Sequence, residues 1–158
     1  MKILITGGAG FVGSNLAIKF KNKYPDYEIT CLDNLKRRGS ELNLTLLLTN
    51  NISFKHADIR CKEDFFEIND VDLIIDASAE PSVMAGINSP IEQVYNNNLL
   101  GTVNCLELAK KLNAGFIFLS TSRIYPIKSI EDLSFVEKET RFELSINQQV
   151  RGVSENGI

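Results

Sequence analysis

The feature that most constrains the fold is a set of spaced glycines between two different apolar patterns. Residues 2–6 form a short, mostly apolar run, and residues 11–23 repeat apolar side chains with helical periodicity. Gly7, Gly10 and Gly13 fill the junction at intervals of three residues. A buried strand that turns through glycines directly into a helix is typical of a parallel α/β sheet. We therefore expect a strand at 2–6 and a helix at 11–23.

The same alternation of patterns continues to residue 119. Short apolar runs predict further strands at residues 28–32, 52–56, 72–76 and 115–119. Periodic stretches predict helices at 40–49, with Ser40 as N-cap, at 64–68 and at 90–112. Strands that alternate with helices through right-handed crossovers predict an α/β fold, a doubly wound parallel sheet of the Rossmann type with strand order 3-2-1-4-5.

This regular pattern fails after the fifth expected strand. Residues 126–158 contain scattered apolar residues and many charges, without a convincing strand or helix. The sequence therefore predicts one domain over residues 1–125, followed by an irregular tail over residues 126–158.

Composition excludes several classes of protein. With 44% hydrophobic and 23% charged residues in 158, the chain can bury a core, and its net charge of −3 disfavours nucleic acid or an anionic membrane as a partner. No apolar stretch approaches the length of a membrane-spanning helix. Cys31, Cys61 and Cys105 lack metal-ligand spacing, and His56 is the only histidine, so we expect no metal site and a reducing, cytoplasmic setting.

The glycines and an acidic residue further on predict a dinucleotide site. Such a site needs a tight turn, close approach of phosphate to backbone amides, and a helix N-terminus directed at the negative charge. Asp33 lies twenty positions after Gly13, where a carboxylate can accept hydrogen bonds from the ribose hydroxyls and repel a 2′-phosphate. NAD is therefore favoured over NADP, although the basic residues 36–38 offer partners for a 2′-phosphate. The bland alternatives are glycines that only punctuate a loop and an Asp33-Asn34 turn.

Longer motifs resemble the extended short-chain dehydrogenase/reductase superfamily, specifically its NAD-dependent sugar-nucleotide epimerases and dehydratases. TGGAGFVGSNL at residues 6–16 is similar to the N-terminal fingerprint of that family. Segments 56–60 (HADIR), 77–81 (ASAEP) and 98–102 (NLLGT) resemble its later motifs. Within the family, residues 34–44, 81–83 and 152–154 are most similar to the branch containing CDP-tyvelose (CDP-paratose) 2-epimerases.

The resemblance implies a set of residues that contact the cofactor. They are Gly7, Gly10, Phe11, Val12, Gly13, Asp33, Asn34, Asp58, Ile59, Ala77, Ser78, Ala79 and Asn98. Asp58 and Ile59 would meet the adenine, and residues 77–79 the ribose and nicotinamide. Two alternatives remain: Asp58 as a helix cap, and Asn98 as a residue that bonds backbone.

The segment after the fifth expected strand resembles the catalytic part of the family only incompletely. Thr121 matches the catalytic Ser/Thr and Tyr125 the tyrosine of the strand motif. The family's reaction also needs a tyrosine followed four residues later by lysine, and residues 28, 31, 99 and 129, which stand four places after the tyrosines, are not lysine. We therefore expect the N-terminal part of a longer enzyme, inactive alone.

In the complete enzyme, the resemblance implies transient oxidation of a sugar carbon of a nucleotide sugar, with return of the hydride. It also implies a homodimer that pairs through a four-helix bundle, made partly from the helix expected at 90–112 and partly from a helix of the missing tyrosine segment. A non-catalytic dinucleotide-binding module and a nucleotide-sugar reductase remain as alternatives.

Overall fold

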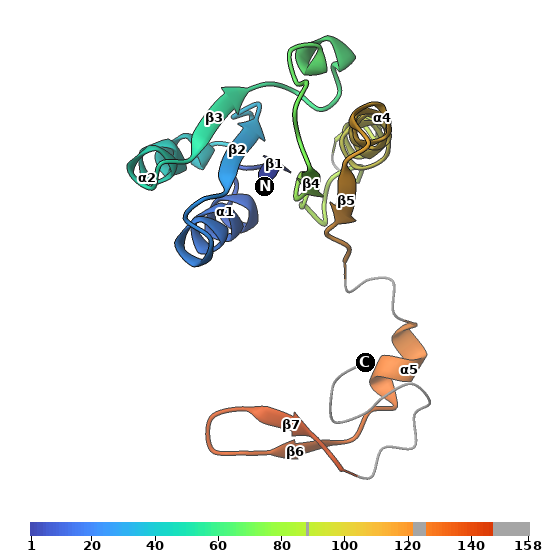
Figure 1. Ribbon diagram of the computed structural model, residues 1–158. Coiled ribbons are helices and arrows are strands. Elements are labelled where there is room, and N and C mark those ends of the chain that lie inside the picture. Colours follow the sequence, from blue (N-terminus) through green and yellow to red (C-terminus); the bar gives the residue numbers. More distant parts are fainter. Residues whose placement is uncertain (88, 122–125, 147–158) are drawn as a thin grey trace. The chain divides into compact units, whose positions relative to one another are not determined.

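The computed structural model describes residues 1–87, 89–121 and 126–146. The chain divides into two units, Met1–Leu119 and Ser120–Ile158. The first unit holds a five-stranded parallel sheet in the order β3-β2-β1-β4-β5, which confirms the predicted topology (Figure 1). The strands are β1 (Lys2–Thr6), β2 (Glu28–Asp33), β3 (Ser53–His56), β4 (Leu73–Asp76) and β5 (Gly115–Phe118). Because they are parallel, their carboxyl ends share one edge.

Both faces of this sheet are covered. The covering helices are α1 (Phe11–Lys23), α2 (Asn43–Thr49) and α4 (Thr102–Leu112). Figure 1 shows α1 and α2 on one side of the sheet and α4 on the other. Successive side chains of a strand point to opposite faces, so Ile3 and Ile5 belong to the core under α1 and α2, whereas Leu4 belongs to the core under α4. Burial of β1 on both faces explains its continuous apolar sequence.

The helix predicted over residues 90–112 is not regular throughout. It consists of α3 (Glu92–Tyr95), a π-helical segment η3 (Asn96–Gly101) and α4. The wide turn includes Asn98 and Gly101, which contact two different loops of the sheet, and such turns often occur at functional sites. No helix in the described part of the chain is long and apolar enough to span a bilayer.

Two other helix predictions are corrected. Ser40 does not cap a helix over 40–49, because Gly39 adopts φ +97° and Ser40 itself enters a 3-10 turn, η1 (Ser40–Leu42), which precedes α2. The short helix expected at 64–68 is a second 3-10 turn, η2 (Lys62–Phe65).

The unit Ser120–Ile158 contains regular structure where the sequence predicts an irregular tail. A five-residue helix, α5 (Ile127–Glu131), precedes an antiparallel hairpin of β6 (Phe135–Glu137) and β7 (Phe142–Leu144). Elements this short span too few residues for hydrophobic periodicity to reveal them. The expectation of an irregular segment is therefore wrong for residues 127–131, 135–137 and 142–144.

Candidate functional site

The glycine-rich turn joins β1 to α1 at the carboxyl edge of the sheet. Gly7 adopts φ +63°, a left-handed conformation that favours glycine, and its carbonyl oxygen accepts a hydrogen bond from the Gly10 amide at 3.0 Å. A Cβ built on Gly7 would lie 2.7 Å from the carbonyl oxygen of Ala77, and one on Gly13 would lie 2.3 Å from the carbonyl oxygen of Gly7. The backbone of the turn therefore packs closely against the loop after β4 and against the first turn of α1, and it has no room for a Cβ at Gly7 or Gly13.

A fourth glycine in this turn, Gly8, is not among the predicted contact residues. A Cβ on Gly8 would lie 2.5 Å from the Cβ of Cys31 on β2, so Gly8 is required for the turn to pass over the neighbouring strand. Gly8 falls outside the spacing of Gly7, Gly10 and Gly13, whereas the longer motif TGGAGFVGSNL contains it.

The first turn of α1 begins with two exposed residues, Phe11 and Val12. The first hydrogen bond within the helix joins the Ser14 amide to the Gly10 carbonyl at 3.0 Å, so the amides of Phe11, Val12 and Gly13 precede it and have no partner within the helix. The Phe11 side chain is 83% exposed, and the first turn carries no acidic residue. These amides and the helix dipole form a positive end suited to an anion.

Asp33 ends β2 and touches the glycine turn. One carboxylate oxygen accepts the Ala9 amide at 3.1 Å, and the other accepts the Leu35 amide at 2.9 Å. An ionised carboxylate has about four acceptor positions, so two remain for further donors. The side chain of Asn43 donates a bond to the Ala9 carbonyl oxygen at 2.8 Å, a contact between residues 34 positions apart.

Asp58, in the loop after β3, is strongly partnered. Its carboxylate accepts hydrogen bonds from the Arg60 guanidinium, from the Arg60 amide at 3.0 Å and from the Asn34 side-chain amide at 2.9 Å. The Arg60 side chain holds the pKa of Asp58 well below its usual range. The residue preceding η2 is Cys61, so the alternative of Asp58 as that element's cap is wrong.

Ile59, in the loop after β3, contacts both η3 and α4. Its carbonyl oxygen accepts the side-chain amide of Asn104 at 2.8 Å, and its side chain fills the space that a Cβ on Gly101 would occupy, 2.3 Å from the Ile59 Cδ1. The predicted adenine loop and the glycine turn thus both stand at the carboxyl edge of the sheet, as Asp33 does.

Residues 77–80 form the loop after β4. Asn98 joins this loop at two points, because its side-chain oxygen accepts the Glu80 amide at 2.7 Å and its side-chain nitrogen donates to the Glu80 carbonyl oxygen at 3.4 Å. These contacts favour the alternative in which Asn98 bonds backbone. Ala77 and Ser78 are half-buried beside Gly7, and Ala79 is exposed.

The predicted catalytic hydroxyl lies in the other unit. Thr121 follows β5 within Ser120–Ile158 and is exposed. Residues 122–125, which include Tyr125, and residues 152–154 are outside the described residues. The role of Thr121 stays a prediction.

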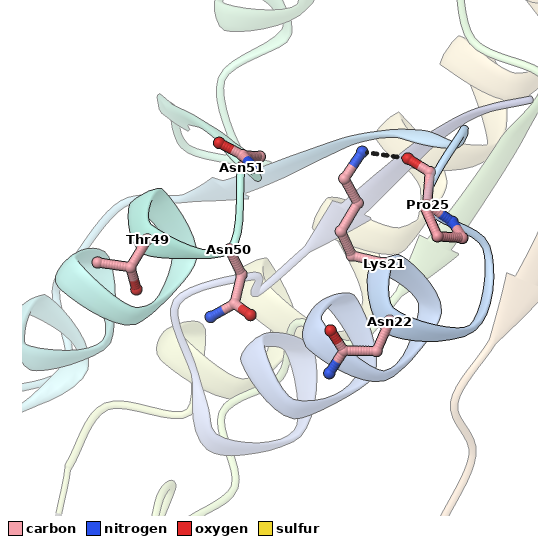
Figure 2. A pocket seen from close by; sticks show the side chains of 6 residues that line it. All are labelled: Lys21, Asn22, Pro25, Thr49, Asn50 and Asn51. Carbon is pink, nitrogen blue, oxygen red and sulfur yellow. Dashed lines mark hydrogen bonds between the residues drawn. The ribbon is translucent and has the colours of Figure 1, made fainter.

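A shallow pocket lies between the carboxyl ends of α1 and α2 (Figure 2). It is lined by Lys21, Asn22, Pro25, Thr49, Asn50 and Asn51. The Lys21 ammonium donates to the carbonyl oxygens of Pro25 and Tyr27, both at 2.8 Å, so it already bonds two backbone groups of this chain. The pocket is at the end of α1 opposite the glycine turn and contains none of the predicted site residues. Across the described residues, no group of three or more acidic, histidine or cysteine side chains is placed to hold a metal ion.

Comparison with known proteins supports the resemblance seen in the sequence. A family model described as the NAD dependent epimerase/dehydratase family matches residues 3–144. The chain is 34% identical over 148 residues to a CDP-paratose 2-epimerase of Salmonella typhi, covering 90% of this chain and 42% of that enzyme. It is 36% identical over 137 residues to a dTDP-D-glucose 4,6-dehydratase of Dictyostelium discoideum, covering 83% of this chain and 31% of that enzyme.

Solved structures give the same relationship. The UDP-Glc/GlcNAc 4-epimerase of Campylobacter jejuni aligns with a TM-score of 0.69 and 33% identity, over 79% of this chain and 38% of its own. A UDP-glucuronic acid 4-epimerase from Bacillus cereus, solved with UDP-glucuronic acid and NAD, aligns with a TM-score of 0.67 and 27% identity, over 80% of this chain and 42% of its own. The chain therefore spans less than half the length of these relatives.

Proposed function

Since the chain belongs to the NAD dependent epimerase/dehydratase family, we propose that it binds NAD along the carboxyl edge of its sheet. The observation that carries this proposal is the position of Asp33. Its carboxylate is bonded to the glycine turn through the Ala9 amide, is only half-buried, and retains acceptor positions. Asp33 thus bonds the glycine-rich turn and still has acceptor positions that can bind ribose hydroxyls.

The residues around this edge fit a dinucleotide. The Gly7–Gly13 turn and the first amides of α1 suit a pyrophosphate, because a Cβ at Gly7 or Gly13 would fill the space the turn needs. Asp33 and Asn34 suit the adenosine ribose, the loop of Asp58 and Ile59 suits the adenine, and residues 77–79 suit the second ribose. When bound, NAD supplies a reversible acceptor for hydride.

For the enzyme as a whole, we propose the chemistry of a nucleotide-sugar epimerase or dehydratase. The relatives are named for CDP-, dTDP- and UDP-linked sugars, which makes a nucleotide sugar the proposed substrate class. Thr121 would hydrogen-bond a sugar oxygen during proton transfer. No tyrosine of this sequence is followed four residues later by lysine, so we expect the 158-residue chain alone to show no turnover.

Assembly and setting are part of the same proposal. An exposed apolar face runs along α3, η3 and α4. Its residues, each between 41% and 58% exposed, are Tyr95, Leu99, Val103 and Leu106. We propose that this face pairs with a second copy of the chain. Sedimentation of the purified chain tests the pairing, and a monomer at all concentrations would contradict it.

Three free cysteines suit a cytoplasmic setting.

Calorimetric titration with NAD and NADP tests the cofactor proposal. We expect the wild-type chain to bind NAD, and Asp33→Ala to bind it about tenfold more weakly because a charge-assisted contact is lost. Asp33→Ala should also lose discrimination between NAD and NADP, which simple loosening of the turn would not produce. Asp26→Ala, at an exposed aspartate between α1 and β2, is the matched control. Absence of NAD binding by the wild type would reject the proposal.

A further inference from the structure

A buried carboxylate at the end of β4 has no role in the proposed contacts with NAD. Asp76 is 1% exposed. One of its oxygens accepts the Thr6 hydroxyl at 2.7 Å, the Ser78 amide at 3.1 Å and the Ser78 hydroxyl, and the other accepts the Thr102 hydroxyl at 3.0 Å. Burial of a polar group this deep costs free energy unless hydrogen bonds replace those it made with water.

The donors come from three separate parts of the unit. Thr6 ends β1, Ser78 lies in the β4 loop, and Thr102 begins α4. Asp76 therefore bonds the central strand, the loop and the helix at one point. Because its side-chain oxygens accept all four of these hydrogen bonds, the carboxylate is the shared acceptor of the cluster.

The β4 loop has a second attachment to the same helix. Asn98 bonds the Glu80 amide and carbonyl group, and Asn98 precedes Thr102 by four residues, about one helical turn. The helix thus holds Ser78 through Asp76, and Glu80 directly. The start of the loop also lies against the glycine turn, where a Cβ on Gly7 would be 2.8 Å from the Ser78 Cα.

We propose that Asp76 and Thr102 are positioning residues that fix the loop of residues 77–80 against the glycine turn for cofactor binding. This inference rests on the proposed binding of NAD. Neither residue needs to touch the cofactor: Thr102 orients Asp76, and Asp76 orients Ser78. The loop is then already ordered before NAD binds, so binding does not have to supply the free energy of ordering it.

Amide hydrogen exchange and NAD titration of the whole chain test this inference. Thr102→Val keeps the shape of the side chain and removes the donor to Asp76. We expect the amides of Ser78 and Glu80 to exchange about tenfold faster without NAD, and NAD affinity to fall about tenfold. Thr102→Ser, which restores the hydroxyl, should return both values to within about threefold of wild type.

Leu108→Val is the matched control for general loss of stability, because Leu108 is buried on α4 within the core. It should lower the melting temperature and leave loop exchange and NAD affinity unchanged. Unchanged exchange in Thr102→Val, or equal changes in Leu108→Val, would overturn the inference. If the wild type binds no NAD, the proposed function fails and with it the role toward the cofactor, while loop exchange still decides whether Thr102 and Asp76 hold the loop.

Discussion

The carboxyl ends of β2 and β4 carry the same residue type in opposite settings. Asp33 is half-buried, accepts one backbone amide on each oxygen and keeps further acceptor positions. Asp76 is buried, and it accepts three side-chain hydroxyls and one amide. An aspartate at this edge of a parallel sheet can therefore serve a ligand or hold the loops that surround it, and the partners decide which.

The difference between the two carboxylates should be largest in the stability of the fold. We expect Asp76→Ala to lower the free energy of unfolding by about 3 kcal/mol, because buried hydroxyls lose their acceptor and a cavity remains. Asp33→Ala should cost only about 1 kcal/mol, since water can reach the amides that it bonds. Urea unfolding followed by circular dichroism measures both. Equal losses would contradict the division of roles.

Gly7, which follows β1 and packs against the loop after β4, offers a second test. Gly7 and Gly39 both have positive φ, +63° and +97°, but a Cβ on Gly7 would lie 2.7 Å from the Ala77 oxygen, whereas one on Gly39 has nothing within 4 Å. Gly39→Ala should cost about 1 kcal/mol from backbone strain alone. Gly7→Ala adds the clash with the β4 loop and should cost about 2 kcal/mol or more.

The same pair of variants separates strain from displacement of the loop. Gly7→Ala should weaken NAD binding and speed amide exchange in residues 77–80, and Gly39→Ala should do neither. If both variants behave alike, the packing of the β4 loop on the glycine turn is not what the site requires.

The strand, turn and helix that hold the predicted dinucleotide site were predictable from the sequence, and the contacts that support the loops around it were not. The bounds of β1 and α1 follow from an apolar run, a periodic stretch and the glycines between them. Asp33 follows from its distance to those glycines. Each of these signals is local, or has a fixed spacing set by one βαβ unit.

The support of the loops depends on contacts that no local pattern records. Asp76 reads in the sequence only as the end of a strand, and its partner Thr6 stands 70 residues away. Asn43 is the first residue of α2, and its bond to the Ala9 carbonyl oxygen joins residues that are 34 positions apart. The π-helical turn of η3 interrupts an apolar pattern that predicts one continuous helix, because residues of that turn contact the loops after β3 and β4.

Asp58, after β3, is an intermediate case and gives the smallest expected effect. It is partly buried and is paired with a cation, and the Arg60 guanidinium lowers the pKa of its carboxyl group. A group whose folded-state pKa is lowered adds stability above its unfolded pKa of about 4, and this stability is lost as the pH falls toward the folded-state pKa. Asp58→Asn should therefore be about 1 kcal/mol less stable than wild type at pH 7.

The difference between wild type and Asp58→Asn should shrink as the pH is lowered below about 4, in urea unfolding measured at each pH. Arg60→Gln removes the cause of the shift and should reproduce the effect, and the double variant should lose little more than either single one. A difference that stays constant with pH, or fully additive losses, would mean that the ion pair does not stabilise the loop after β3. Asp58 would then resemble Asp33, as a carboxylate held available for a ligand, more than Asp76.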